Sequence, residues 1–270
     1  MKRVPISALS ILLVASLFAC GTNNTPSSQR TGPVMGTTDT LAGEAVEAWT
    51  TLNDQGVVTD VTVKIAAAAL DTATSAESTL VTFPDEVADQ TFFNHFVVDF
   101  NPAGHPPGPY LTAHFDLHFY GITNQERVAI DCQDEPLPEG LTAGTPANSN
   151  DYVPNFFLIP DTSLGGPDSQ GTCVPQMGVH AIDVRSPEMN PEAPAAFTET
   201  YIIGYHKGRI AFLEPMVTQE FFSSRPELSW DVPRPALLGR AVLWPGSFSA
   251  FYNAEDDMYE LTFSEFSDIE

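Results

Sequence analysis

The chain is poor in positive charge and in cysteine. Eleven lysine and arginine residues stand against thirty-five aspartate and glutamate residues, which gives a formal net charge of -24. Proteins that bind nucleic acid need a basic surface to neutralise phosphate, so this composition predicts no nucleic-acid partner. The three cysteines include no C-x-x-C pair, and the usual zinc-finger pattern is therefore excluded.

Several common functional motifs are also missing. The sequence contains no G-x-G-x-x-G, no G-x-x-x-x-G-K-[ST], no G-x-S-x-G and no D-x-D-x-D-G. These absences exclude the usual dinucleotide, phosphate-loop, serine-hydrolase and EF-hand sites. A calcium-dependent surface module is consequently the weakest interpretation of the acidic composition.

The N-terminal segment has the pattern of a bacterial lipoprotein signal. Lys2 and Arg3 precede an apolar run over residues 6–18, and residues 17–20 read Leu-Phe-Ala-Cys. The run is too short for a permanent bilayer-spanning helix. We expect residues 1–19 to be a signal peptide and Cys20 to carry the lipid, so that the protein is exported and anchored to a membrane of the cell envelope. Plain secretion is the alternative.

Residues 20–40 are rich in Thr, Ser, Asn, Gly and Pro and lack apolar periodicity. This composition predicts a flexible tether between the lipidated cysteine and the folded body. No further change in composition marks a boundary, so residues 41–270 are predicted to form a single β-rich domain.

Cys132 and Cys173 are the cysteines left once Cys20 is assigned to the lipid. An exported protein meets an oxidising compartment, which favours a disulfide between them. The alternative is a pair of thiolate metal ligands, but the spacing usual for such ligands is missing.

Short stretches of alternating or β-branched side chains recur along the chain, with turn residues between them. Strands are predicted at residues 45–52, 57–65, 91–100, 110–120, 127–131, 156–159, 179–184, 197–205, 209–214, 241–252 and 258–263, and a short helix at 66–73. Many short strands and few helical stretches are typical of a mainly β protein. We expect an antiparallel β-sandwich or barrel with one or two short helices.

The segment from Tyr110 to Tyr120 alternates without a break. Successive side chains on a strand point to opposite faces, so His114, Asp116 and His118 would project together while their neighbours form an apolar face. Two imidazoles and a carboxylate are donors that can converge on one metal ion. The spacing differs from the zinc-peptidase motif H-E-x-x-H, because Phe115 stands where the glutamate would be. A polar, solvent-facing strand edge is the alternative.

Further ligands must come from distant segments. His180 and Asp183 flank a predicted strand, and His105 lies in a proline-rich loop. Glu214 ends the apolar face of a hairpin strand, where a buried carboxylate needs a cation or a strong donor. An ion pair of Glu214 with Arg127 or Arg209 is the alternative.

Together these residues predict a mononuclear divalent-metal site. The expected ligands are His114, His118, His180 and Glu214, with Asp116, His105 and Asp183 in support, and with Asp116 as either a ligand or the acceptor that orients an imidazole. Zinc, manganese, iron and copper all suit these donors. The competing interpretation is a non-catalytic envelope protein without metal, in which the polar face binds a small ligand or another subunit. No reaction follows from the sequence.

The chain also resembles a known bacterial family. The family's motifs correspond to residues 99–110 (DFNPAGHPPGPY), 113–120 (AHFDLHFY), 178–181 (GVHA) and 208–218 (GRIAFLEPMVT). They resemble a domain of unknown function named after a Thermus thermophilus protein controlled by a sigma-E and anti-sigma-E system. This chain departs from the family pattern at Ala113, Leu117 and Ala181, where the family has Pro, Phe and Trp.

The resemblance covers nearly all of the chain beyond residue 43. It implies that six residues act as one functional set and that the protein associates into a homo-oligomer; the set comprises His105, His114, Asp116, His118, His180 and Glu214. Loss of the family's Trp at Ala181 would open space beside His180. No activity is implied, because the family has none that is settled.

Overall fold

The computed structural model describes residues 31–133, 135–160 and 173–270. The predicted signal peptide and the predicted lipidation site at Cys20 lie outside the described residues. Within the described part of the chain, no helix is long and apolar enough to cross a bilayer.

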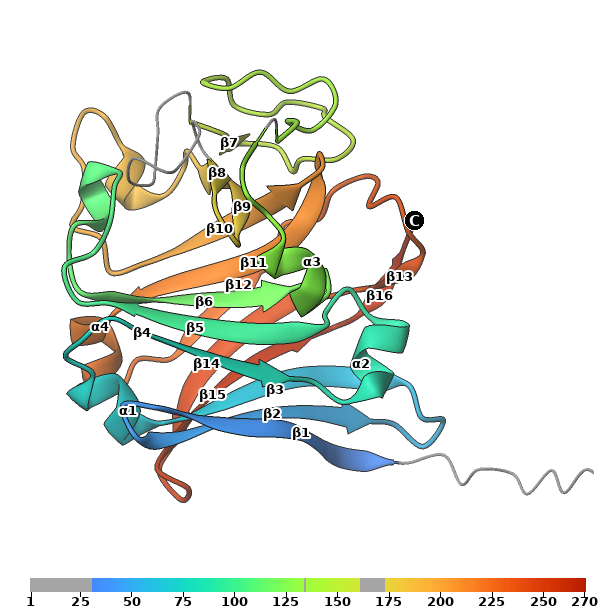
Figure 1. The fold of residues 1–270 in the computed structure, drawn as a ribbon, viewed down its shortest axis with the longest axis vertical. Coiled ribbons are helices and arrows are strands. Elements are labelled where there is room, and N and C mark those ends of the chain that lie inside the picture. Colours follow the sequence, from blue (N-terminus) through green and yellow to red (C-terminus); the bar gives the residue numbers. More distant parts are fainter. Residues whose placement is uncertain (1–30, 134, 161–172) are drawn as a thin grey trace, which may run out of the picture.

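The described strands form two antiparallel sheets that lie face to face (Figure 1). The first sheet has the order β1-β2-β3-β15-β14-β12, with bounds Gly32–Leu41, Glu44–Leu52, Val58–Ala66, Met258–Ser264, Ser247–Asn253 and Leu228–Asp231. The second has the order β4-β5-β6-β11-β10-β9-β7, with bounds Glu77–Thr82, His95–Asn101, His114–Tyr120, Arg209–Thr218, Glu199–His206, Gly178–Asp183 and Phe157–Leu158. Neither sheet closes on itself, so the sandwich alternative is confirmed and the barrel is not.

Smaller elements complete the described fold. β8 (Cys173–Val174) pairs with β9, and β13 (Val242–Trp244) pairs with β16 (Ser267–Ile269). The short α-helices are α1 (Ala67–Thr72), α2 (Asp85–Gln90), α3 (Asn124–Val128) and α4 (Gln219–Ser223), and 3-10 turns cover Gly108–Tyr110 and Pro187–Met189. The helices are thus more numerous than the one or two expected.

The main core lies between the two sheets and is rich in phenylalanine. The Phe119 ring lies 4.7 Å from that of Phe96 in the same sheet and 4.8 Å from that of Phe263 in the opposite sheet. These side chains are fully buried. The odd-numbered side chains of β6, which are Phe115, Leu117 and Phe119, therefore point into the sandwich. The even-numbered side chains point to the outer face of the second sheet.

The predicted tether is wrong for residues 32–40, which belong to strand β1. This strand pairs with β2 and also approaches β4, where the Thr82 amide donates to Thr37 Oγ1 at 2.7 Å. A Cβ at Gly36 would lie 2.2 Å from the Thr82 carbonyl oxygen, so the approach requires glycine. Because most of β1 is exposed, its small polar residues resemble those of a linker.

Two of the predicted strands also need correction. Residues 108–110 form a 3-10 turn, so β6 begins at His114. Residues 127–131 were predicted as a strand, but helix α3 covers Asn124–Val128. Thr123 and Glu126 form a capping box at its N-terminus, a signal that the sequence contains.

Candidate metal centre

Strand β6 carries three polar side chains on the outer face of the second sheet. His114, Asp116 and His118 are all buried, with 0 %, 3 % and 0 % exposure. β6 lies between β5 and β11. The prediction of one shared face is confirmed, while the alternative of a solvent-facing strand edge is wrong.

The neighbouring strands add the residues that complete the site. In the antiparallel register Glu214 of β11 lies opposite His118, between the pairs Leu213↔Phe119 and Met216↔Asp116. His180 of β9 pairs with Gly204 of β10. A Cβ at Gly204 would lie 1.9 Å from the Phe212 ring, so the glycine makes room for that ring beside both histidines. The Phe212 centroid is 5.1 Å from each of the His118 and His180 rings.

His118, His180 and Glu214 form one compact group of possible ligands, here named the inner triad. The Nε2 atom of His118 lies 3.5 Å from Glu214 Oε1, and the Nε2 atom of His180 lies 3.8 Å from Glu214 Oε2. These distances are long for hydrogen bonds. Two donors bound tetrahedrally to one ion at about 2.1 Å would be about 3.4 Å apart. The spacing therefore suits a shared ion better than direct pairing.

His105, His114 and Asp116 form a second group, here named the outer triad. The Nε2 atom of His105 is 3.3 Å from Asp116 Oδ2, and that of His114 is 3.0 Å from Asp116 Oδ1. The predicted four-ligand set is therefore wrong in one respect, because His114 belongs with Asp116 and His105 rather than with the inner triad. Asp116 lies among the possible ligands themselves.

The Nδ1 atoms of three of these histidines contact backbone carbonyl oxygens. His105 contacts Pro106, His114 contacts Thr112 and His180 contacts Gly178, at 2.8, 2.7 and 3.1 Å. A carbonyl can only accept, so Nδ1 donates and Nε2 is left with its lone pair in the neutral imidazole. This is the usual arrangement of a metal-binding histidine, whose second nitrogen is held by an acceptor.

In His118 the Nδ1 atom faces a carboxylate instead of a backbone carbonyl. Its Nδ1 lies 3.2 Å from Asp99 Oδ2, although the contact misses good hydrogen-bond geometry. Asn101 donates from Nδ2 to Asp116 Oδ2 at 2.8 Å, which orients that carboxylate. Neither Asp99 nor Asn101 was among the predicted site residues. Their position could have been predicted, because Asp99 and Asn101 alternate with apolar residues along β5 and therefore share one face of that strand.

Burial and charge together set the protonation of the inner triad. Burial raises the pKa of Glu214 to about 8 although the nearby His118 lowers it. For His118, burial favours the neutral form, but Glu214 and Asp99 outweigh it and raise the pKa to about 9. Burial and the positive charge of His118 lower the pKa of His180 to about 3. His180 is thus neutral at physiological pH, the form that binds metal ions.

In the outer triad, Asp116 is the ionised group. Burial would raise its pKa, but contacts with His105 and His114 hold the pKa well below its usual range. Burial likewise opposes the charged form of His105, but Asp116 raises its pKa to about 9. Protons on His105, His118 and Glu214 would therefore compete with any cation for these groups.

A single cavity of about 230 Å³ is lined by two members of each triad, whereas His114 and His118 lie behind its wall. Its polar lining includes Asp99, His105, Asp116, His180 and Glu214. The remaining wall is largely apolar, with contributions from Tyr110, Val174, Met177, Ile182 and Ile202. The cavity has room for water or a small ligand beside the polar groups.

Other predicted site residues lie elsewhere. Asp183 forms a bidentate ion pair with Arg185, the closest contact being 2.6 Å, so its predicted supporting role is wrong. It stands three residues from His180 on a strand and therefore points to the opposite face. The alternative partners of Glu214 are also engaged elsewhere: Arg127 lies over the Tyr120 ring and Arg209 over the Tyr152 ring.

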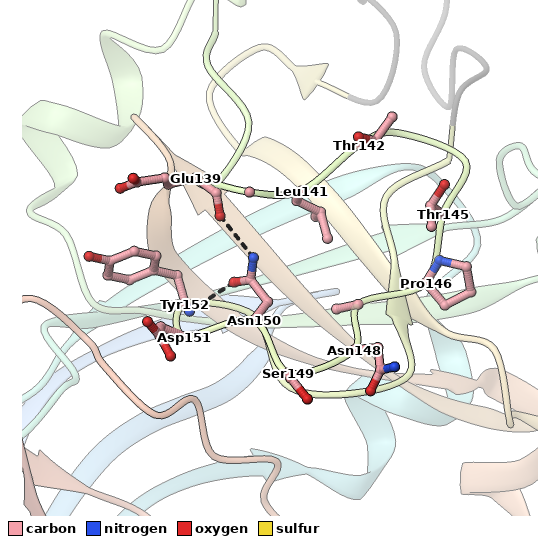
Figure 2. Close-up of a pocket in the computed structure, with 12 residues that line it drawn as sticks. Glu139, Leu141, Thr142, Thr145, Pro146, Asn148, Ser149, Asn150, Asp151 and Tyr152 are labelled. Atoms are coloured by element: carbon pink, nitrogen blue, oxygen red, sulfur yellow. Dashed lines mark hydrogen bonds between the residues drawn. The ribbon is translucent and has the colours of Figure 1, made fainter.

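A larger hollow of about 540 Å³ is formed by one loop over residues 139–152 (Figure 2). The Asn150 side chain holds this loop together by donating to the Glu139 carbonyl oxygen and accepting from the Tyr152 amide. Its lining residues include no histidine and no cysteine. We therefore assign the chemistry to the smaller cavity.

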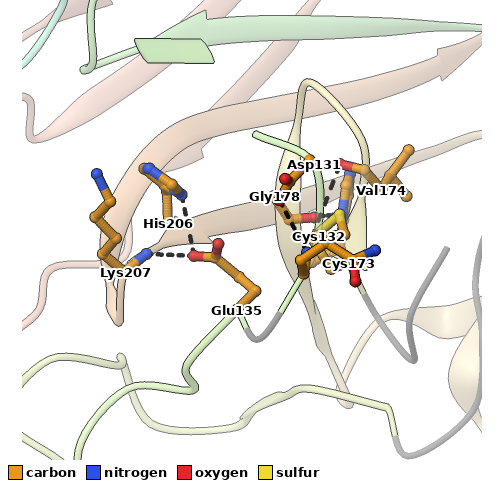
Figure 3. The surroundings of a disulfide bond; sticks show 10 residues. Asp131, Cys132, Glu135, Cys173, Val174, Gly178, His206 and Lys207 are labelled. Carbon is orange, nitrogen blue, oxygen red and sulfur yellow. Dashed lines mark hydrogen bonds and ion pairs between the residues drawn. A yellow bond between two sulfur atoms is a disulfide. The ribbon is translucent and has the colours of Figure 1, made fainter. Parts of the chain in front are cut away.

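The predicted disulfide is confirmed and lies close to the site. Cys132 and Cys173 are bonded, with their Cα atoms 5.6 Å apart (Figure 3). Cys173 belongs to β8, whose Val174 lines the cavity. β8 pairs with the beginning of β9, two residues before His180. The thiolate-ligand alternative is therefore wrong.

The two remaining histidines lie outside both triads. His95 is buried and stacks on Tyr120 at 4.8 Å, and burial lowers its pKa to about 4. His206 is the last residue of β10, beside the hairpin turn, and its Nδ1 is 3.0 Å from Glu135 Oε1 (Figure 3).

Comparison of the whole chain with known proteins found no matching family model, no similar curated protein and no similar solved structure.

Proposed function

We propose that this protein binds a divalent transition-metal ion through the inner triad of His118, His180 and Glu214. The observation that carries the proposal is the spacing of the ligand atoms: His118 Nε2 and His180 Nε2 approach the two oxygens of the buried Glu214 carboxylate at 3.5 and 3.8 Å, too far for good hydrogen bonds. Glu214 Oε2 and His118 Nε2 are buried without a hydrogen-bond partner. A metal ion would satisfy these atoms together.

Two imidazoles and one carboxylate leave coordination positions open. Sites of this composition hold catalytic zinc or non-haem iron, and the open positions take water or substrate. The cavity beside the triad suits such a small ligand. We propose a first-row divalent ion as the cofactor and assign no reaction to it.

The setting we propose is the cell envelope. The support is the lipoprotein pattern ending at Cys20, together with the disulfide, which fits an oxidising compartment. In this proposal the lipid holds the metal-binding sandwich at a membrane surface, and the strongly acidic body repels nucleic acid.

Metal analysis of protein purified without a histidine tag tests the proposal. After loading with Zn²⁺ and removal of excess ion, we expect at least one tightly bound equivalent per chain by elemental analysis. His180→Ala should remove the ion of the inner triad. His206→Ala is the matched control, because His206 contacts Glu135 away from the cavity. Wild-type protein that retains no Zn²⁺, Mn²⁺, Fe²⁺ or Cu²⁺ would refute the proposal.

Binding of the metal should strengthen as the pH rises from 6 to 8. His118, with a pKa raised to about 9, must lose its proton before Nε2 can bind the ion, and Glu214, with a pKa raised to about 8, must ionise. For each proton that the metal displaces, lowering the pH by one unit weakens the apparent metal affinity about tenfold. Competition with a chelator at pH 6, 7 and 8 measures the slope. An affinity independent of pH would contradict the proposed ligands.

A further inference from the structure

The outer triad repeats the ligand composition of the inner triad. Each has two imidazoles and one carboxylate, and the triads have no residue in common. His114 Nε2 and Asp116 Oδ1 are buried and face each other at 3.0 Å without good hydrogen-bond geometry, and His118 Nε2 and Glu214 Oε2 are buried without a hydrogen-bond partner. The possible ligand atoms of this site are therefore divided between two places.

One ion cannot satisfy both sets of atoms. Ligands bound to a single ion at about 2.1 Å lie no more than about 4.2 Å from one another. Atoms within 4.8 Å of one another form two groups here, rather than one group of six. The division follows from β6, because Asp116 and His118 occupy successive positions on one face, about 7 Å apart.

The outer triad is also separately oriented. Asn101 holds Asp116 Oδ2 at 2.8 Å, which leaves Oδ1 facing His114. Backbone carbonyls at Pro106 and Thr112 fix the two imidazoles. The His105 Nε2–Asp116 Oδ2 distance of 3.3 Å is close to the separation of about 3.4 Å between two ligands of one tetrahedral ion, while the 3.0 Å of the His114–Asp116 contact also suits a direct ion pair.

We propose that the cavity binds two divalent metal ions, one in each triad. This inference rests on the proposed function for the inner triad and adds a second site made by His105, His114 and Asp116. Asp116 and Glu214 supply one negative charge to each ion, and Asp99 adds a third charge behind His118. These carboxylates offset the repulsion between the two cations. Both ions border the same cavity, so a small ligand there can contact both.

Metal stoichiometry tests the second site. Chelator-treated, tag-free protein is loaded with Zn²⁺, freed of excess ion and analysed for zinc per chain. We expect two equivalents in the wild type, one in His114→Gln and one in His118→Gln, with His206→Gln retaining two. Circular dichroism and thermal melting confirm that each variant is folded. Asp116→Asn replaces His114→Gln if that variant fails to fold, and it should also retain one equivalent.

The outcomes separate the two proposals. One equivalent in the wild type, lost in His118→Gln and retained in His114→Gln, overturns the second site and leaves the proposed function standing. One equivalent retained in His118→Gln and lost in His114→Gln overturns the inner triad. No zinc in the wild type overturns both sites.

Discussion

Replacing Glu214 by glutamine is expected to weaken metal binding at the inner triad by at least about 100-fold, with little effect on the metal-free fold at pH 7. Removing a residue that only hydrogen-bonds to a metal ligand weakens metal affinity by about 10-fold to 100-fold. Glu214 is proposed as a ligand itself, so its loss should have at least the larger effect. Glutamine keeps the size of the side chain but removes its negative charge.

The unchanged fold follows from the protonation of Glu214. Burial raises its pKa to about 8, so the metal-free fold accommodates the acid form, and glutamine resembles that form in shape. Because the folded state holds this proton more tightly than the unfolded chain, the contribution to stability is lost as pH rises from about 4.5 through 8. The metal-free variant should therefore be more stable than the wild type at pH 9.

Chelator competition gives the metal affinity, and urea unfolding with chelator present gives the stability. Glu135→Gln is the matched control, since this carboxylate also contacts a histidine, His206, but lies outside the cavity. We expect the control to bind metal as the wild type does. Wild-type affinity in Glu214→Gln would remove Glu214 from the ligand set.

The central strand of the site was predictable from its own residues. Alternation over β6 assigned His114, Asp116 and His118 to one face, and the structure confirms this. Alternation along one strand does not show, however, which side chains of neighbouring strands lie close to it. The prediction therefore placed His114 with His180 and Glu214, whereas the register of β5, β6 and β11 divides them into two triads.

Other errors have local physical causes. Strand β1 has small polar residues because most of it is exposed, so it lacks the apolar alternation that predicts a strand, even though its partner β2 follows it directly in the chain. Asp183 was grouped with His180 by proximity in sequence, although an odd spacing on a strand separates their faces. Asp99 shares the face of the site by the same alternation rule, but only the pairing of β5 with β6 places it beside His118.

Loss of the Cys132–Cys173 disulfide is expected to lower the free energy of unfolding by about 4 kcal/mol, as loop-closure entropy gives for a separation of this size. The two cysteines are 41 residues apart in sequence. Without the bond the unfolded chain gains conformational freedom, so the unfolded state becomes more favourable. Replacing both cysteines by alanine avoids placing new polar groups at buried positions.

Metal affinity should fall in the same variant, because the disulfide holds β8 against β9. Val174 of β8 lines the cavity, and Gly178, which pairs with it, provides the carbonyl that orients His180. Freed from Cys132, this short pairing would open more often and His180 would lose its fixed orientation. Urea unfolding of metal-free protein measures the stability, and chelator competition measures the affinity. Lower stability with unchanged affinity would show that β9 orients His180 without help from β8.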